Sequence, residues 1–410
     1  MTEFSSQDQY SKRLCAVCNS ANSRLLFRQN FSRLSDNSSL LSGYNVVVCD
    51  QCGFCFADNI PDQKIFDAYY RDMSKYEKAE RGGQDTPYDQ ARFQVMANVI
   101  LGFLTSAQMQ IFEIGCANGQ LLALFKKNGY ENVSGIDPSP ACAQIAMQRF
   151  GIQVNTGTFS NLDLPECFAD VMILAGVLEH VSDLDQALDK IAFHTKKGGR
   201  VFISVPNASR YAEGEDAPFQ EFSMEHINFF GPGSLSNLMA TRGFVPIAMI
   251  EDMLPVNLRT KTPVVHGIFC KPEEESAPPF QIIKDTATIG GLRNYITQCR
   301  SEDERIRNIV AGLVQEKKPL LVWGVGNHTL RLLAKSSLGQ ANIVAFVDGN
   351  PRYHGCQVLN RPVLAPKVLP DYPNVAVLIS SRAYQEEIAS EIKQTLKCTN
   401  QIVRFYSLTQ

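Results

Sequence analysis

The chain has 410 residues, of which 44% are hydrophobic and 20% charged, and its formal net charge is -3. This length predicts two or three domains. The composition excludes a disordered chain, and the small negative charge leaves no broad basic field for nucleic acid. No apolar run reaches the about eighteen residues of a membrane span, and the N-terminus lacks the apolar core of a signal peptide. We therefore expect a cytoplasmic protein with no membrane partner.

The first 55 residues hold five of the twelve cysteines, and four of the five form two CxxC pairs. Two residues between cysteines let both sulfurs face one point, and two such pairs complete a tetrahedral zinc site. The expected ligands are Cys15, Cys18, Cys49 and Cys52. Four thiolates leave no open position, so the zinc is expected to be structural. Exchange of Cys55 with Cys52, and a set of reduced core cysteines without metal, stay open.

A helical apolar spacing from Tyr88 to Leu104 predicts a helix that precedes the next domain. The apolar strand "MQIFEIG" then leads through Gly-Cys-Ala-Asn-Gly into the helix "QLLALFKKNGY". A strand, a tight turn and a helix begin the nucleotide-binding half of a doubly wound sheet. Glu113, two residues before the first glycine, would repel a pyrophosphate and suits a cationic ligand instead.

S-adenosylmethionine is such a ligand, because it carries an ammonium and a sulfonium and has no phosphate. The next strand, "NVSGID", ends at Asp137, where an acid can accept both ribose hydroxyls. The turn around Thr158 is expected beside the adenine, and a further strand stops near Gly176. The residues expected to line the cofactor site are Glu113, Gly115, Cys116, Ala117, Gly119, Asp137, Pro138, Thr158, Phe159 and Gly176.

From about Met109 to Lys271 the order of motifs resembles the class I S-adenosylmethionine-dependent methyltransferases. The matching stretches are EIGCANG, the acid of GIDPS, VLEHV and GGRVFISVPN. Methyl transfer to carbon or oxygen needs a base, and a histidine can take a proton near neutral pH. The candidates are His226, with Glu225 beside it, and His180 in LEHV. A structural role in loop capping stays open for both histidines.

The last third begins with a linker over residues 270–280 and a long helix from about Ile289 to Gln315. A second strand–turn–helix follows, with glycines spaced as GxG and Thr329 where a third glycine would fall. This predicts a second Rossmann-like domain whose turn could hold a pyrophosphate, or which is purely structural. The expected substrate-binding residues are Gly324, Gly326, Asn327, His328 and Asp348.

The three-part order resembles the sugar C-methyltransferase family, which methylates keto-deoxysugars attached to nucleoside diphosphates. The resemblance rests on the CxxC pairs, EIGCANG, the EH pair and GVGN…FVDGNP. It implies a structural zinc, a sugar nucleotide between the core and the C-terminal domain, His226 as the base and Tyr76 as an active-site tyrosine. Family members usually carry a tyrosine and a histidine just before the EH pair, where this chain has Ser223 and Met224.

The predicted fold class is α/β, with a Rossmann-like methyltransferase core, an N-terminal zinc-binding module and a second C-terminal Rossmann-like domain. The expected segments are a zinc module (1–60), a helical connector or lid (61–105), the methyltransferase domain (106–275) and a substrate-binding domain (276–410). The leading prediction is methylation of a nucleotide-linked sugar or related activated metabolite by a monomer or homodimer. Alternatives are O-methylation of a glycan or other small hydroxylated metabolite, and a scaffold or sensor that binds S-adenosylmethionine without turnover.

Overall fold

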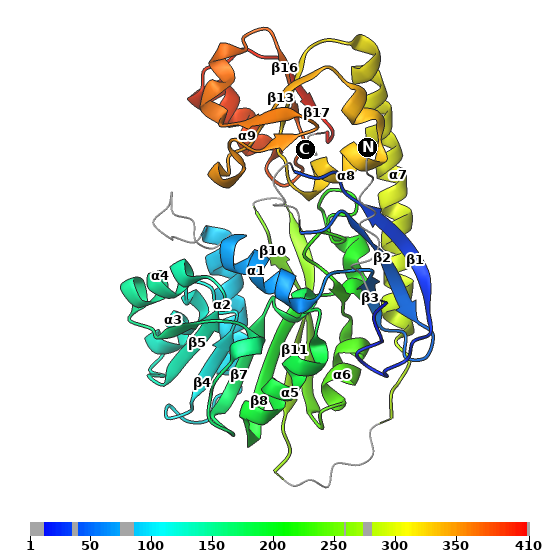
Figure 1. Ribbon diagram of the computed structural model, residues 1–410. Coiled ribbons are helices and arrows are strands. Elements are labelled where there is room, and N and C mark those ends of the chain that lie inside the picture. Colours follow the sequence, from blue (N-terminus) through cyan, green and yellow to red (C-terminus); the bar gives the residue numbers. More distant parts are fainter. Residues whose placement is uncertain (1–11, 35–39, 74–85, 258–259, 274–280, 408–410) are drawn as a thin grey trace. The chain divides into compact units, whose positions relative to one another are not determined.

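The computed structural model describes residues 12–34, 40–73, 86–257, 260–273 and 281–407 (Figure 1). These residues form two compact units that are not contiguous in sequence. The first comprises residues 1–26, 46–214 and 226–292, and the second comprises 27–45, 215–225 and 293–410. The expected division at residues 60, 105 and 275 follows sequence order, whereas each unit combines segments that are distant along the chain.

The first unit is built on a seven-stranded sheet in the order β10-β11-β8-β7-β4-β5-β6. Its strands are β4 (Ile111–Ile114), β5 (Val133–Asp137), β6 (Val154–Thr156), β7 (Ala169–Ala175), β8 (Thr195–Pro206), β10 (Val245–Pro255) and β11 (Lys261–Cys270). Strands β4 to β8 pair in parallel, while β11 pairs antiparallel with β8 and with β10. The parallel strands therefore end at one common edge, where ligands of doubly wound sheets bind.

Helices cover both faces of this sheet. Apolar side chains of α2 (Pro87–Leu101) and α3 (Gln120–Lys127) pack on one face, against a core that includes Ile111 and Ile173. Side chains of α5 (Leu184–His194) and α6 (Pro232–Ala240) pack on the other, against Phe112 and Leu174. Successive residues of β4 thus point to opposite cores, as the period of two in a strand requires. The remaining helices of this unit are α1 (Gln63–Met73), α4 (Pro140–Phe150) and the start of α7 (Thr286–Glu316).

The cysteine pairs lie beside a second, four-stranded sheet in the order β1-β2-β3-β9. Its strands are β1 (Ser23–Asn30), β2 (Gly43–Cys49), β3 (Cys55–Asp58) and β9 (Asn228–Phe229). The eight residues of β1 contain a single fully buried side chain. Buried side chains around the cysteines, such as Phe54 and Phe56, join the same core cluster as α5 and α6. The cysteine segment is therefore packed into the first unit.

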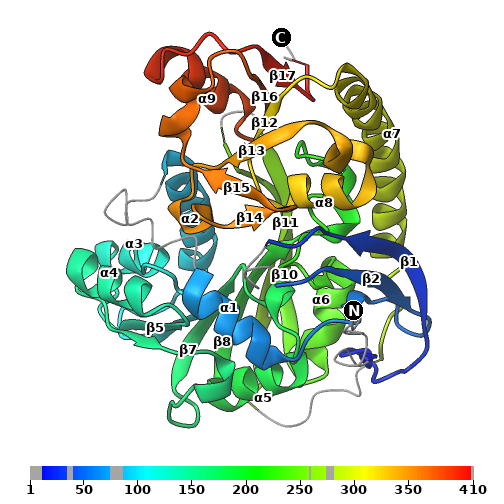
Figure 2. The same ribbon diagram turned by 45° about the horizontal axis from the view of Figure 1, so that its top comes forward.

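The second unit is another Rossmann-like sheet, in the order β14-β15-β13-β12-β16-β17 (Figure 2). Its strands are β12 (Leu320–Trp323), β13 (Ile343–Val347), β14 (Gln357–Val358), β15 (Arg361–Leu364), β16 (Ala376–Ile379) and β17 (Ile402–Arg404). Its helices include α8 (Asn327–Lys335) and α9 (Gln385–Ser390). With this second sheet, the predicted α/β fold class is confirmed. None of the helices in the described part of the chain is both long and apolar enough to cross a membrane.

Two expected helices differ from the observed ones at their ends. The helix expected over residues 88–104 ends at Leu101, because Gly102 closes it as the C-cap. The helix expected from Ile289 begins at Thr286, since the buried Asp285 accepts hydrogen bonds from the amide and hydroxyl of Thr288. Side-chain caps of this kind extend a helix beyond its apolar periodicity.

The adjacent glycines of α7 give a matched test of packing. A Cβ on Gly291 would lie 2.1 Å from the carbonyl oxygen of Ser209, whereas a Cβ on Gly290 would meet nothing within 4 Å. We expect Gly291→Ala to lower the free energy of unfolding by more than about 2 kcal/mol, because backbone must move. Gly290→Ala should raise it by roughly 0.5–1 kcal/mol through helix propensity. Urea denaturation of both variants checks this, and equal effects would contradict the packing.

Candidate active site

The glycine turn predicted from the sequence lies at the carboxyl end of β4. Gly115, Ala117 and Gly119 all have positive φ angles, of 70°, 46° and 76°. A left-handed conformation costs an alanine roughly 1–2 kcal/mol, and such strain persists where surrounding structure enforces it. Here the amide of Gly115 donates to the carbonyl of Ile136 at 2.8 Å, which ties the turn to β5. The turn thus bends away from the sheet edge before α3 begins.

Glu113 is buried at the end of β4, and its Oε2 has no hydrogen-bond partner among the described residues. Burial, with a smaller contribution from the charge of Asp137, raises the pKa of the Glu113 carboxyl well above its ordinary value. An acceptor without a partner in the interior is costly unless a ligand supplies a donor. A cationic amine would donate hydrogen bonds to Glu113 and would favour the ionised form of its carboxyl. Glu113 therefore fits the role expected from the sequence.

Asp137 ends β5 and is also buried. Its Oδ2 accepts from the amide of Ala117 at 2.8 Å, and its Oδ1 accepts from the amide of Ser139 at 2.9 Å. These bonds fix the Asp137 carboxylate against the glycine turn. Pro138 lies between Asp137 and Ser139, the residue whose amide donates to Oδ1. The acid expected to contact a ribose thus also holds the turn in shape.

Thr158, Phe159 and Gly176 lie at the same edge of the sheet, after β6 and β7. The Thr158 hydroxyl donates to Asp67 of α1 at 3.0 Å, and Phe159 is buried. Gly176 has a φ of 70°, and its amide donates to the carbonyl of Ser204 at 2.8 Å. The edge therefore brings together all ten residues expected at the cofactor site, with α1 docked on one loop.

His180 and His226 come together, although 46 positions separate them along the chain. Their ring centroids are 5.1 Å apart, and Tyr70 of α1 lies edge-on to His180 at 5.4 Å. Glu179 is buried, and its Oε1 lies 3.8 Å from His180 Nε2. The amide of Ile227 donates to the carbonyl of Glu179 at 2.8 Å, which joins the two loops. One ligand atom from each of Glu179, His180 and His226 lies within 4.8 Å of the others.

Two other expected catalytic residues are placed differently. Tyr76 lies outside the residues that the structure describes. Glu225 belongs to the second unit, where its amide donates to the hydroxyl of Ser223 at 3.2 Å. The boundary between the units thus falls between Glu225 and His226.

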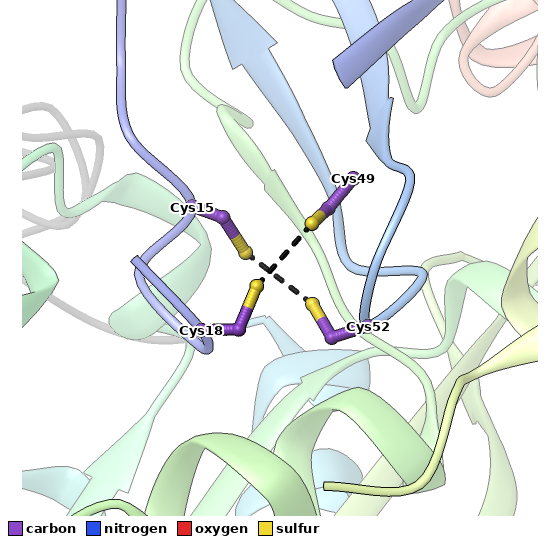
Figure 3. A group of neighbouring side chains, drawn as sticks. All are labelled: Cys15, Cys18, Cys49 and Cys52. Carbon is purple, nitrogen blue, oxygen red and sulfur yellow. Dashed lines mark hydrogen bonds between the residues drawn. The ribbon is translucent and has the colours of Figure 1, made fainter. Parts of the chain in front are cut away.

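The four expected cysteine ligands form one group, with all sulfurs within 4.8 Å of one another (Figure 3). Cys15 and Cys52 are 3.3 Å apart at their sulfurs, and Cys18 and Cys49 are 3.4 Å apart. Zinc bonds of about 2.3 Å in a tetrahedron separate sulfurs by about 3.8 Å, so a small expansion admits the ion. The hydrogen bond between Cys15 and Cys52 lowers the pKa of the Cys15 thiol and raises that of the Cys52 thiol.

Cys55 takes no part in this group. Its sulfur is buried and lies 3.5 Å from the carbonyl oxygen of Gly53, and burial raises its thiol pKa above the ordinary value. The described cysteines therefore offer one four-sulfur set, made by the two CxxC pairs.

The second glycine turn connects β12 to α8. Gly324 has a φ of 106°, and a Cβ on the exposed Gly326 would meet nothing within 4 Å. Asp348 accepts from the amides of Val325 at 2.9 Å and Asn350 at 2.8 Å. The Thr329 hydroxyl donates to the carbonyl of Gly324 at 2.7 Å, so it braces the turn where a third glycine was absent.

His328 and Asn327 begin α8 but face different surroundings. His328 is buried, its Nε2 lies 3.1 Å from the Tyr406 hydroxyl, and burial lowers its pKa to about 3. Its side chain therefore contributes to the interior of the second unit, whereas the side-chain Oδ1 of Asn327 accepts from the amide of Met224 at 3.4 Å. Of the expected substrate-binding set, Gly326 is exposed and only His328 is buried.

Comparison with known proteins assigns the sheet of the first unit. Residues 88–248 match the family model described as a methyltransferase domain. This segment is a class I methyltransferase domain. The cofactor of such domains is S-adenosylmethionine, and the unpartnered Glu113 oxygen at the glycine turn is compatible with it. Residues 316–403 match a second model, described as C2185-like, N-terminal.

Several relatives share parts of the chain. A probable S-adenosylmethionine-dependent methyltransferase of Mycolicibacterium smegmatis is 27% identical over 37% of this chain, and the match spans 56% of that relative. The malonyl acyl-carrier protein O-methyltransferase of Serratia marcescens is 25% identical over 43% of this chain and 65% of its own length. The C-methyltransferase NovU of Streptomyces niveus is 22% identical over 73% of this chain and 70% of its own length. The last match extends well beyond the methyltransferase domain.

Sequence reasoning missed several residues around the two histidines. Glu179 stands inside the LEHV motif and could have been found there, whereas Tyr70 was only one of several tyrosines. Asp67 and Gln63 of α1 hold loops of the methyltransferase domain, since Gln63 Oε1 accepts from the amide of Ser182 at 2.7 Å. A polar residue on a helix of mixed polarity is normally expected to face solvent, so the sequence does not indicate that it binds a loop of another segment.

The unpartnered carboxyl of Glu113 predicts how cofactor affinity depends on pH. A bound ammonium favours the carboxylate, so binding should lower the raised pKa of Glu113, and affinity should therefore rise with pH across that interval. We expect S-adenosylhomocysteine, which keeps the ammonium, to bind more tightly at about pH 8 than at about pH 5. Glu113→Gln should bind roughly 10- to 100-fold more weakly, as for the loss of a charge-assisted hydrogen bond.

Isothermal titration calorimetry across this pH range makes the measurement. The Glu113→Gln variant serves as its own control, because without the carboxyl its affinity should be nearly independent of pH. A wild-type affinity that does not change with pH would exclude Glu113 from the ammonium site.

Proposed function

We propose that the chain is an S-adenosylmethionine-dependent methyltransferase that acts on a nucleotide-linked deoxysugar or related activated metabolite, with His226 as the base. The observation that carries this proposal is the pairing of His226 with His180 in the unit that holds the cofactor turn. The buried Glu179 lies beside them and can stabilise an imidazolium after proton transfer. The arrangement supplies a base, a charge to support it and a cofactor turn within one domain.

In this proposal His226 accepts the proton from the carbon next to a ketone of the acceptor. The electron pair left on that carbon forms the new bond to the methyl group. S-adenosylmethionine, when bound, offers that methyl on a positively charged sulfur, which keeps the electron pair of the broken carbon–sulfur bond. Glu113 and Asp137 hold the cofactor, and Tyr70 and Tyr76 are candidates for contact with the acceptor. Glu225, the neighbour of His226 in the sequence, is the candidate that would tune it.

The substrate class is supported by the extent of one relative. NovU, whose name describes a C-methyltransferase, matches 311 residues, about twice the length of the domain match over residues 88–248. Because this similarity extends beyond the methyltransferase domain, it supports the view that the other segments of the two proteins have the same function. We therefore assign the nucleotide part of the acceptor to the turn at Gly324, Gly326 and Asn327, braced by Asp348.

O-methylation of a glycan or another small hydroxylated metabolite is the second candidate. It is favoured by Ser223 and Met224, which stand where the resembling sugar C-methyltransferases carry a tyrosine and a histidine. A phenol there would help to stabilise an enolate, and a hydroxyl acceptor needs no enolate. The same histidine would then remove a hydroxyl proton. Relatives named as O-methyltransferases are compatible with this alternative.

We also propose that Cys15, Cys18, Cys49 and Cys52 hold one structural zinc ion. The four sulfurs converge on one point, and three of the four residues are buried. Four thiolate ligands fill a tetrahedral zinc site and leave no position open for catalysis. Their attachment to the core of the first unit makes the ion part of its folding.

Solvent exchange tests the base and the acceptor together. In deuterated water, with S-adenosylhomocysteine in place of the methyl donor, the wild type should exchange the α-proton of a nucleoside diphosphate keto-deoxysugar. His226→Asn should slow exchange at least about 100-fold, as for the loss of a general base, while its affinity for S-adenosylhomocysteine stays the same. His180→Asn, the matched variant of the neighbouring ring, should lose less.

The other outcomes separate the alternatives. A larger loss in His180→Asn would move the base to that residue. Exchange that disappears with a chelator and returns with Mg²⁺ would replace the base by a cation at Glu179, His180 and His226. Absence of exchange, with methyl transfer to hydroxyl acceptors, would favour O-methylation. Cofactor binding without turnover of either acceptor class would favour the scaffold or sensor.

Metal analysis tests the zinc site. Plasma mass spectrometry of the purified protein should find one zinc per chain, and Cys49→Ser should abolish it. Because the buried cluster loses its ion, the free energy of unfolding of the first unit should fall by more than about 4 kcal/mol. Cys55→Ser, a matched change of a buried thiol outside the cluster, should keep the zinc. Zinc-free wild-type protein of unchanged stability would contradict the proposal.

A further inference from the structure

Arg13 lies two residues before the first cysteine ligand and contacts several separate segments of the first unit. Its Nη1 donates to the carbonyl of Ala57 at 2.9 Å, and its Nη2 donates to the carbonyl of Ser182 at 3.0 Å. The same guanidinium reaches the carbonyl of Ile227 at 3.4 Å and the side-chain carbonyl of Asn228 at 3.1 Å. These acceptors belong to the loops that follow His180 and His226 and to β3.

Asn228 provides a second link between the same loops. It is 1% exposed, and its Nδ2 donates to the carbonyls of Leu178 at 2.8 Å and Val181 at 2.7 Å. Both donors of the amide are thus used on the segment that contains His180, and its carbonyl is used by Arg13. A fully hydrogen-bonded amide of this kind fixes the geometry of the groups around it. Together with the backbone bond from Ile227 to Glu179, the side chains of Asn228 and Arg13 therefore hold the two histidine loops at their observed spacing.

The cysteine cluster is connected to this network at both ends. Arg13 precedes Cys15, and its amide donates to Asp58 at 2.8 Å, at the end of β3. Strand β3 begins three residues after Cys52 and pairs antiparallel with β9, where Cys55 faces Phe229 and Phe56 faces Asn228. A metal that closes the cluster would hold both the residue before Cys15 and the strand after Cys52 in position.

The guanidinium of an arginine can bind several carbonyl groups of fixed geometry at once, and the ammonium of a lysine is less suited to this. Arginine offers five donors in a rigid planar fork, whereas lysine offers a point charge on a flexible stem. The guanidinium also lies over the ring of Phe56, 5.4 Å from its centre. Its stem and its charge are both held in place.

We propose that Arg13 is a positioning residue that sets the separation of His180 and His226, and that the cysteine cluster acts on the active site through it. The proposal rests on the function proposed above for His226. It gives the cysteine segment a role in catalysis in addition to its contribution to folding. Arg13 acts on the segment after β7 directly, through the carbonyl of Ser182, and indirectly, through Asn228.

Histidine side-chain NMR tests this without knowledge of the acceptor. The chain has six histidines, so the full-length, zinc-loaded protein labelled with ¹⁵N-histidine gives a small set of signals. Arg13→Met should shift or broaden those of His180 and His226 and leave His194, His266, His328 and His354 unchanged. Lys12→Met, a change of the exposed neighbouring residue, should leave all six unchanged. Zinc content and affinity for S-adenosylhomocysteine should stay at the wild-type level in both variants.

Kinetics provide the second measurement. Arg13→Met should lower kcat about 10- to 100-fold, as expected for a displaced base, with little change in KM for S-adenosylmethionine. In a His226→Asn background the same change should cost almost nothing further, because Arg13 acts through His226. Free guanidinium at low concentration should restore part of the activity of Arg13→Ala, and methylammonium should not.

The outcomes distinguish this proposal from the assignment of the base. Unchanged His180 and His226 signals, or six shifted signals with lost zinc, would overturn a specific positioning role. If Arg13→Met does not fold, Arg13→Lys replaces it, and it should perturb the same two signals. Full activity of His226→Asn would refute His226 as the base, while the NMR result would still report whether Arg13 positions the two rings.

Discussion

The short pairing of β3 with β9 is the constraint on which the candidate active site depends. It joins only two residue pairs, yet it fixes the segment that begins at His226 against the strand that follows the second cysteine pair. The amide of Ala57 also donates to the carbonyl of Ile227 at 2.8 Å. Two strands of this length are not stable alone. Their stability comes from the aromatic core beneath them, where Phe54 stacks on Phe230 at 5.3 Å, and in our proposal from a zinc ion.

The carboxyl edge of the strands β4 to β7, where the cofactor is expected, depends on a different physical feature. Because β4, β5, β6 and β7 pair in parallel, they end at one edge of the sheet. To bind a cofactor, the loops at this edge need a backbone that the cofactor can approach closely and one buried charge. The glycine turn provides the approach, and Glu113 provides an acid whose desolvation is relieved by a cationic ligand. Asp137 links the two, since it holds the turn through the amide of Ala117. In our proposal, cofactor binding at this edge thus uses a carboxyl that is unfavourable in the protein alone.

The two Rossmann-like units share one hydrogen-bond arrangement at their glycine turns. In each, the acid that ends the second strand accepts from an amide of the glycine turn and from the amide two residues ahead of itself, Asp137 in the first unit and Asp348 in the second. They differ two residues before the first glycine, where the first has Glu113 and the second has Val322. A buried acid suits a cation, whereas an uncharged turn at a helix N-terminus suits a phosphate. The two turns therefore share the bracing acid but differ in backbone, since Ala117 has a φ of 46° and Gly326, two residues after its own first glycine, has a φ of -73°.

The sequence by itself determined the features that local pattern encodes: the α/β class, the glycine turns, the acids at strand ends and the four cysteines that meet at one point. These follow from strand and helix periodicity, from backbone conformations that favour glycine, and from the spacing of CxxC pairs. Only the tertiary structure decided the rest. It joined His180 to His226, placed Glu225 in the other unit, buried His328 against Tyr406, and brought Arg13 to carbonyls up to 214 positions away. The physical reason is that backbone carbonyls are the same in every residue, so no sequence pattern shows which of them a distant guanidinium or amide will bind.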